Sequence, residues 1–345
     1  MRHHIMNIKA LLLSLSVLSV TSCIRETMPD NTPAGNFEAL WEMMDQRYCF
    51  FDYKAAEYGL DWNEVYGRYK PRISDNMSSE GLFEVLCEML SELRDGHVNL
   101  YSSIDVGRNW SWYEAFPPNF YEHLQSNYLG TDYRIGGGLR YQILDDNVGY
   151  IYYSDFTGSL DDSYLNRALN YFSLCNGLII DVRSNGGGYI FNIDKIVSRF
   201  IEEPVLCGYV CHKNGPGHSD FSDYAERWIE PATDQLRWNK PVAILSNRGC
   251  YSATNTFVSD MKALPQVCVI GDRTGGGGGI PSSFELPNGW SVRYSACPML
   301  DSDRRQIEFG VEPDIRVDIS DSDFARGVDT IIESARVWIN SFLSK

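Results

Sequence analysis

Ser252 lies at a junction where a serine could act as a nucleophile. Residues 241–279, PVAILSNRGCYSATNTFVSDMKALPQVCVIGDRTGGGGG, predict an apolar strand at 242–245, a polar turn, a helix that begins near Ser252 and a second strand at 267–270. The first N–H groups of a helix lack intrahelical partners, and with the helix dipole they favour negative charge. A serine there could attack a carbonyl beside donors that stabilise the oxyanion. The alternative is a helix N-cap, a role that serine fills well.

Three other segments could complete such a site. The run DVRSNGGG at 181–188 follows an apolar strand, and its glycines can present backbone N–H groups to a ligand. It is not a phosphate loop, because it lacks the G-K-[ST] ending. His97, in a D-G-H turn, has the near-neutral pKa that suits a general base. The tail segment 306–314 carries Glu308 and Glu312, which by default are turn or solvated carboxylates.

These segments belong to a set of blocks that together resemble a known family. In order they are ELRDGHV (92–98), GYIYYSDF (149–156), GLIIDVRSNGGG (177–188), NRGCYSATN (247–255), GDRTGGGGG (271–279) and GVEPDI (310–315). Their order and spacing resemble the tail-specific (C-terminal processing) serine proteases, and most closely the tricorn-core-like branch. The resemblance covers roughly residues 36–340 and implies peptide-bond hydrolysis without a metal or cofactor.

The resemblance implies a role for each matching residue. Ser252 falls on the family's nucleophile, and the N–H groups of Ala253 and of Gly187 or Gly188 would form the oxyanion hole. His97 falls on the histidine base of the tricorn-like branch.

A carboxylate completes that branch's catalytic set by fixing the histidine tautomer. Glu308 is the nearest match, with Glu312 and Asp95 as alternatives.

The chain departs from the family pattern at three places. Many members use a lysine base in a G-K-G loop, but that position is Gly277, and Lys262 lies several turns along the helix of Ser252. The branch can place a serine before the histidine, whereas this chain has Gly96. The segment 98–146 is too short for the PDZ domain that many members carry.

The elements that must position these residues indicate an α/β protein. Apolar residues at helical spacing predict helices between 36 and 97. From residue 148, apolar runs alternate with helical stretches, which favours a layered α/β core. The resemblance makes this a core of the ClpP/crotonase type under an N-terminal helical cap. Strands at 283–286, 291–296 and 315–317 are expected as antiparallel additions, with a closing helix over 324–342.

The domain organisation follows from this pattern. We expect a signal peptide at 1–22, a tether at 23–35, a helical domain at 36–97, a short insert at 98–146 and the protease core at 147–345. Aromatic residues at 110–113 and 116–121 are expected to pack the helical domain on the core, or else to line a peptide cleft.

The N-terminus predicts export. A basic start, the apolar run 10–20 and small residues form a secretory signal, and V-T-S followed by Cys23 resembles a bacterial lipobox. This predicts lipidation of Cys23 and anchoring in the cell envelope, facing the periplasm or the outer surface.

The composition narrows the partners. The net charge of −16 without a basic patch argues against nucleic acid, and the scattered cysteines lack metal-ligand spacing. We therefore expect an envelope lipoprotein that cleaves peptides or unfolded proteins. An inactive peptide-binding, chaperone-like relative and a serine esterase are the alternatives.

Overall fold

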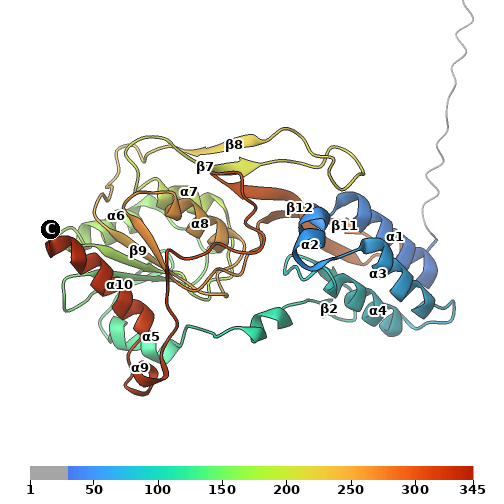
Figure 1. The fold of residues 1–345 in the computed structure, drawn as a ribbon, viewed down its shortest axis with the longest axis horizontal. Helices are drawn as coiled ribbons and strands as arrows, with labels where there is room; N and C mark the ends of the chain where they lie inside the picture. Colours follow the sequence, from blue (N-terminus) through green and yellow to red (C-terminus); the bar gives the residue numbers. More distant parts are fainter. Residues whose placement is uncertain (1–29, 345) are drawn as a thin grey trace, which may run out of the picture.

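The computed structural model describes residues 30–344, which form two lobes joined by a long antiparallel sheet (Figure 1). The expected signal peptide and Cys23 lie outside the described residues. Among residues 30–344, no helix combines the length and apolar character needed to cross a membrane.

The larger lobe is built on a seven-stranded sheet in the order β13-β10-β9-β6-β5-β4-β3. Its strands are β3 (Arg134–Gly136), β4 (Leu139–Ile143), β5 (Gly149–Tyr153), β6 (Leu178–Asp181), β9 (Val242–Ser246), β10 (Val267–Gly271) and β13 (Ile315–Arg316). Strands β5, β6, β9, β10 and β13 run parallel to one another, and β4 and β3 form an antiparallel edge. The expected α/β fold is confirmed.

Two details of this sheet differ from the sequence expectations. The expectation of an antiparallel strand near residue 315 is wrong. Strand β13 pairs with β10 in parallel, because the chain returns to the edge of the sheet in the direction of β10. The segment 98–146, expected as a short insert, supplies β3 and β4 to the core sheet, where Leu139 and Tyr141 are buried.

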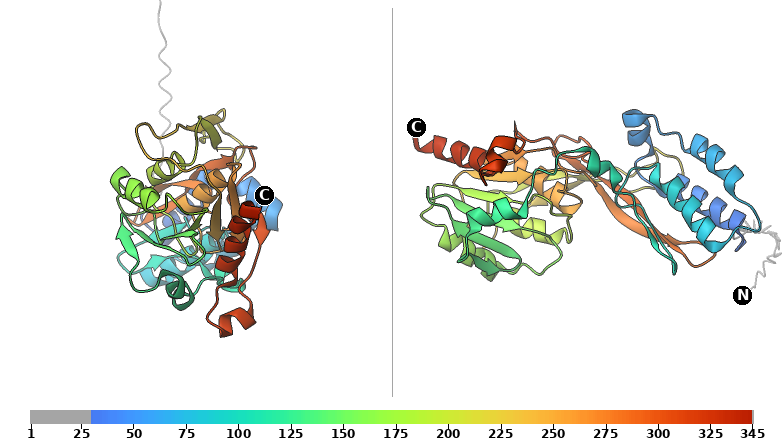
Figure 2. Two further views of the ribbon diagram at one scale, coloured as in Figure 1. Left: turned by 90° about the vertical axis from the view of Figure 1, so that its left-hand side faces the viewer. Right: turned by 90° about the horizontal axis from the view of Figure 1, so that it is seen from below.

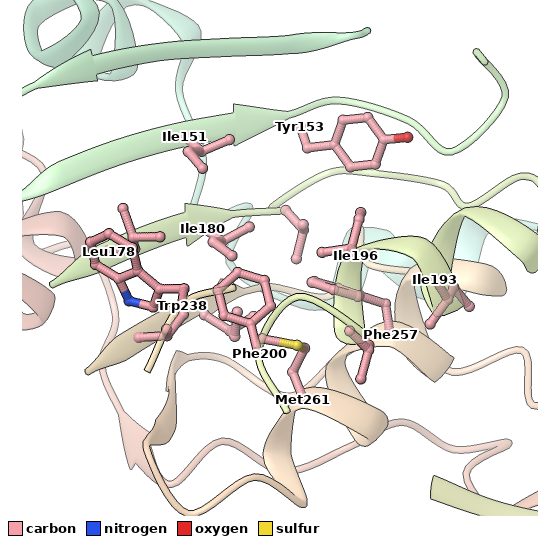
Figure 3. Close-up of a cluster of buried hydrophobic side chains, with 14 of the residues drawn as sticks. Ile151, Tyr153, Leu178, Ile180, Ile193, Ile196, Phe200, Trp238, Phe257 and Met261 are labelled. Carbon is pink, nitrogen blue, oxygen red and sulfur yellow. The ribbon is translucent and has the colours of Figure 1, made fainter. Parts of the chain in front are cut away.

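Alternate residues of the strands face the two sides of the sheet, as the period of two requires. In β6, Leu178 and Ile180 face one core and Ile179 faces the other. Helices α6 (Asp162–Tyr171), α7 (Phe191–Val197) and α8 (Ala253–Lys262) cover the first face, where Ile196 and Phe257 pack beside Ile180 (Figure 3). The second face is covered by α5 (Glu122–Leu129) and α10 (Thr330–Asn340), which is preceded by α9 (Asp321–Ala325) and followed by η3 (Ser341–Ser344).

The smaller lobe is helical. It contains α1 (Pro33–Arg47), α2 (Phe51–Tyr58), α3 (Trp62–Tyr69), η1 (Lys70–Arg72) and α4 (Ser79–Ser91). Its core is shared with the antiparallel sheet, because Phe284, Trp290 and Val292 are buried among the apolar faces of these helices. The expected helical segment therefore packs on strands that come from the far end of the chain.

The antiparallel sheet connects the two lobes. It runs β2-β1-β12-β7-β8, and β11 also pairs with β12. Its strands are β1 (Asn99–Tyr101), β2 (Val106–Gly107), β7 (Val205–Val210), β8 (Ala225–Ile229), β11 (Gly279–Glu285) and β12 (Ser291–Asp301), and η2 (Ser111–Ala115) lies in the connection back to the large lobe. Strand β12 begins against the helices and ends beside β7, so it spans the junction (Figure 2).

This arrangement brings three distant loops together. The carboxyl ends of the neighbouring parallel strands β6 and β9 carry the glycine loop and the Ser252 turn, at the edge where α/β sheets usually place their sites. The turn between α4 and β1 carries His97 from the helical lobe. The site consequently lies where the two lobes meet.

Candidate active site

Ser252 adopts a strained backbone that presents its hydroxyl to His97. Its φ of 58° and ψ of −123° are unusual for a non-glycine residue, and strain of this kind concentrates at functional sites. Its side chain makes no capping hydrogen bond to α8, so the N-cap role is not what the structure shows. Instead, Ser252 Oγ lies 2.9 Å from Nε2 of His97. This is the contact that a general base needs with a serine nucleophile.

His97 is buried and held by its own turn. Its backbone N–H donates to Oδ1 of Asp95 at 2.8 Å, and its ring packs edge-on against Tyr251. Burial lowers the pKa of His97 to about 4, against the opposing effect of the Asp95 carboxylate. The ring is therefore neutral over the physiological range, with Nε2 next to the serine hydroxyl. Its Nδ1 atom has no hydrogen-bond partner within residues 30–344.

Asp95 is the carboxylate that organises this turn. Besides the His97 amide, its oxygens accept hydrogen bonds from Tyr48 (2.9 Å), Tyr251 (3.1 Å) and Ser295 (2.8 Å). Burial alone would raise the pKa of Asp95, but Lys54, His97 and the donated hydrogen bonds outweigh it and hold the pKa below its ordinary value. An ionised carboxylate is thus fixed beside the histidine.

Glu308 is buried nearby but is engaged elsewhere. Its Oε1 accepts from Nζ of Lys54 at 2.8 Å, and its Oε2 accepts from the amide of Gly278 at 3.0 Å. Burial raises the pKa of Glu308 to about 7, although Lys54 opposes this shift. Glu312 is exposed and lies 3.3 Å from Nε of Arg273. Of the three candidate carboxylates, Asp95 is therefore the one in contact with His97.

The glycine loop and the start of α8 meet at Ser252. Oδ1 of Asn185 accepts from the amide of Gly187 at 2.9 Å and from the hydroxyl of Thr254 at 2.6 Å, which ties the two segments together. A Cβ atom on Gly187 would lie 2.9 Å from both Cβ of Ser252 and the nitrogen of Ala253, so only glycine allows this approach.

This loop geometry distinguishes the two glycines named as oxyanion donors. The amide of Gly187 is used by Asn185. The amides of Gly188 and Ala253 donate to no atom within the described residues. They form the pair available to an oxyanion beside Ser252.

The departures from the family pattern have steric explanations. A Cβ atom on Gly96 would lie 2.3 Å from the ring of Trp110, so a serine cannot stand before His97 here. Trp110 packs against Tyr251, which agrees with the expectation that these aromatic residues pack the helical domain on the core. Phe116 instead stacks on the guanidinium of Arg248. The side chains of residues 112 and 113 lie outside the described part. Lys262 pairs with Asp314 at 2.9 Å.

Sequence reasoning missed Lys54, Asn185 and Tyr251. Asn185 directly precedes the three glycines, and Tyr251 directly precedes Ser252, so adjacency to the motifs was the available signal. Lys54 carried no signal, because its partner lies far along the chain. In the described residues, no cluster of histidine, cysteine, aspartate or glutamate could hold a metal ion.

Comparison with known proteins places the chain in a family. Residues 147–317 match peptidase family S41, and residues 29–91 match the tricorn protease C1 domain. A solved structure of a candidate peptidase from Parabacteroides merdae is 50% identical, with a TM-score of 0.85, over 90% of this chain and 97% of that one. The chain belongs to peptidase family S41.

More distant relatives agree with this fold. The carboxy-terminal processing protease CtpB of Bacillus subtilis is 24% identical over 56% of this chain and 39% of its own length, so the chain spans well under half of that relative. Mature CPAF complexed with lactacystin has a TM-score of 0.71 at 12% identity, over 91% of this chain and 99% of that one. Tricorn protease has a TM-score of 0.53 at 17% identity, over 90% of this chain and 37% of that one.

Proposed function

We propose that this protein is a serine endopeptidase that hydrolyses peptides or unfolded proteins. The observation that carries the proposal is the 2.9 Å contact between Ser252 Oγ and His97 Nε2. Membership of family S41 supports a peptide as substrate.

The proposed mechanism uses residues already in place. Ser252 Oγ attacks the scissile carbonyl carbon while neutral His97 takes the hydroxyl proton. The amides of Gly188 and Ala253 donate to the oxyanion, and each such donor typically contributes about 10²–10³ in rate. His97 then returns the proton to the leaving amine, and water hydrolyses the acyl-enzyme with the same base. Asp95 positions the histidine and favours the imidazolium as it forms.

A fluorophosphonate probe tests this assignment. The purified protein is treated with the probe, and the adduct is located by peptide mass spectrometry. We expect labelling at Ser252 that is lost in His97→Ala, while circular dichroism shows both proteins folded. Absence of labelling in folded wild-type protein would reject the peptidase and favour the peptide-binding alternative. Turnover of ester substrates without any peptide turnover would favour the esterase.

We also propose that the protein is an envelope lipoprotein anchored through Cys23. The signal layout followed by V-T-S-C supports this. Metabolic labelling with a palmitate analogue should mark the wild-type protein and not Cys23→Ser, and the wild type should fractionate with membranes. Equal labelling of both would reject the anchor.

A further inference from the structure

A cavity of about 230 Å³ opens beside Tyr251, the residue that precedes the nucleophile. Helix α2, the turn before His97, the loop after β9, the loop after β10 and the tail near Glu308 all contribute to its wall. It is thus assembled from both lobes, at the same junction as the Ser252–His97 pair.

Basic side chains outnumber acidic ones in the lining of this cavity. Its basic residues are Lys54, Arg94, Arg248 and Arg273, and its acidic residues are Glu57 and Glu308. The whole chain carries a net charge of −16, so a cluster with more basic than acidic residues runs against the composition. Such a cavity attracts an anionic group.

Most of the guanidinium donors in this cluster are unspent. Arg248 uses its Nε on Asp272 at 3.1 Å, and Nε of Arg273 lies 3.3 Å from Glu312. Arg94 forms no ion pair in the described part of the chain. Because a guanidinium has five N–H donors, each of these arginines keeps donors for a further acceptor.

Aromatic rings hold two of the arginines in place. The guanidinium of Arg94 lies 4.5 Å from the ring centroid of Tyr58, and that of Arg248 lies 4.0 Å from that of Phe116. Stacking of this kind fixes the plane of the fork and leaves its N–H edges open. The rings also give the cavity apolar walls that suit a short methylene stem.

The backbone links this cavity to the catalytic histidine. Arg94 has a φ of 44°, a left-handed conformation that is uncommon outside glycine, and it directly precedes Asp95 in the turn that holds His97. A group bound at Arg94 therefore contacts the segment that positions the base.

We infer that the cavity lined by Arg94, Arg248 and Arg273 is a substrate subsite that binds a carboxylate of the peptide. This rests on the proposed function and names the class of peptide that it would cleave best. The apolar walls beside the arginines fit the methylene stem of an aspartate or glutamate side chain, so the carboxylate is that of an acidic side chain near the cleaved bond. Planar, paired donation to a carboxylate is the recognition that arginine provides best.

Turnover of matched peptides is the first test. A peptide cleaved by the full chain is found by profiling a denatured protein digest, and variants with Glu→Gln or Asp→Asn changes or an amidated C-terminus are compared. Loss of a charge-assisted hydrogen bond should lower kcat/KM by about tenfold or more for the variant that lacks the recognised carboxylate. Loss on a side-chain change would identify the recognised residue, whereas loss on amidation alone would show that the cavity binds the substrate's C-terminus and would overturn the side-chain assignment. Equal turnover of all peptides would overturn the subsite.

Variants of the cavity provide the second test. Arg94→Gln should lower kcat/KM about tenfold more for the acidic peptide than for the neutral peptide. Arg94→Lys keeps the charge but loses the planar fork, so its kcat/KM for the acidic peptide should lie between those of the wild type and Arg94→Gln. Arg72→Gln, which loses a pair with Glu88 on the helical lobe, is the matched control and should change neither. An equal loss on both peptides in Arg94→Gln would overturn the proposal.

Binding to Ser252→Ala separates this proposal from the proposed function. Fluorescence anisotropy of the acidic and neutral peptides needs no catalysis. Tighter binding of the acidic peptide to Ser252→Ala, together with no cleavage of either peptide by the wild-type protein, would keep the subsite and reject the peptidase. Cleavage by the wild-type protein, together with equal binding of both peptides to Ser252→Ala, would keep the peptidase and reject the subsite.

Discussion

The ring of Tyr251 occupies the space that a side chain at Gly277 would need. A Cβ atom on Gly277 would lie 2.5 Å from Cζ of Tyr251, and Gly277 has a φ of +78°. The Tyr251 hydroxyl is bonded to Asp95, so the ring cannot easily leave. Position 277 is where the family resemblance places the lysine base. In this chain a lysine there and Tyr251 exclude each other, and His97 is the residue whose ring contacts the Ser252 hydroxyl.

Restoring the family's lysine should therefore fail. We expect Gly277→Lys to abolish fluorophosphonate labelling, because the new side chain displaces Tyr251 from the turn of Asp95 and His97. Gly277→Ala should already lower the free energy of unfolding by about 2–4 kcal/mol, since it adds backbone strain and overpacking. Chemical denaturation gives this free energy.

The matched control for this pair is Gly289→Ala. Gly289 also has a positive φ, +83°, but open space surrounds its Cβ position. It should show the strain without the clash, so the difference between the two alanine variants isolates the contact with Tyr251. Equal destabilisation of the two, or an active Gly277→Lys protein, would contradict the steric explanation.

The free energy of unfolding should fall far more when one partner of the buried pair Lys54–Glu308 is removed than when both are removed. Lys54→Met leaves Glu308 buried without its cation and should cost about 3–5 kcal/mol of unfolding free energy. The double variant Lys54→Met/Glu308→Gln removes the uncompensated charge and should recover a large part of that loss. A double-mutant cycle by urea denaturation measures the coupling. Additive losses would mean that the pair does not interact as the structure shows.

Asp95→Asn should weaken both the fold of the turn and the base. Two tyrosine hydroxyls, a serine hydroxyl and the His97 amide donate to this carboxylate, and an amide cannot accept them all. We expect a loss of about 1–3 kcal/mol in unfolding free energy, together with slower labelling of Ser252.

Tyr48→Phe is the control for Asp95→Asn. It removes one of these donors and keeps the charge, so it should slow labelling less than Asp95→Asn does. If Asp95→Asn labels at the wild-type rate while Glu308→Gln does not, the positioning role belongs to Glu308.

The parts of the fold and site that the sequence predicts are those with local signals. The alternation of buried strands and helices predicts the core, and the strand-turn-helix pattern predicts the place of Ser252. The pairing of β12 with β1 and β7 has no local signal, because it joins residues far apart in the sequence, such as Asn99 with Arg293 and Val210 with Met299. For the same reason the direction of β13 was mispredicted: two residues at a sheet edge carry no periodicity that could fix it.

The contacts of the candidate site show the same division. His97 and Ser252 could be singled out from their motifs, whereas the choice among the carboxylates could not be made. Asp95 is two residues from His97 and reaches its amide through a tight turn. Glu308 matches the family position more closely, but a lysine from α2 engages it, and only the packed structure brings that lysine close.

The pH dependence of labelling should report the buried state of His97. Its pKa is lowered to about 4, mainly by burial, so the neutral base is present above that pH and is lost as the pH falls through about 4. An unperturbed histidine would lose activity near pH 6.5. The second-order rate of fluorophosphonate labelling between pH 3.5 and pH 8, with circular dichroism at each pH, should place the acid midpoint far below 6.5. Because the pKa of His97 is lower in the folded protein than in the unfolded chain, its contribution to the free energy of unfolding is full above pH 6.5 and is lost as the pH falls through about 4. His97→Gln lacks this titration, so its free energy of unfolding should depend less steeply on pH in this range. A labelling midpoint at 6.5 or above would contradict the buried, neutral state of His97.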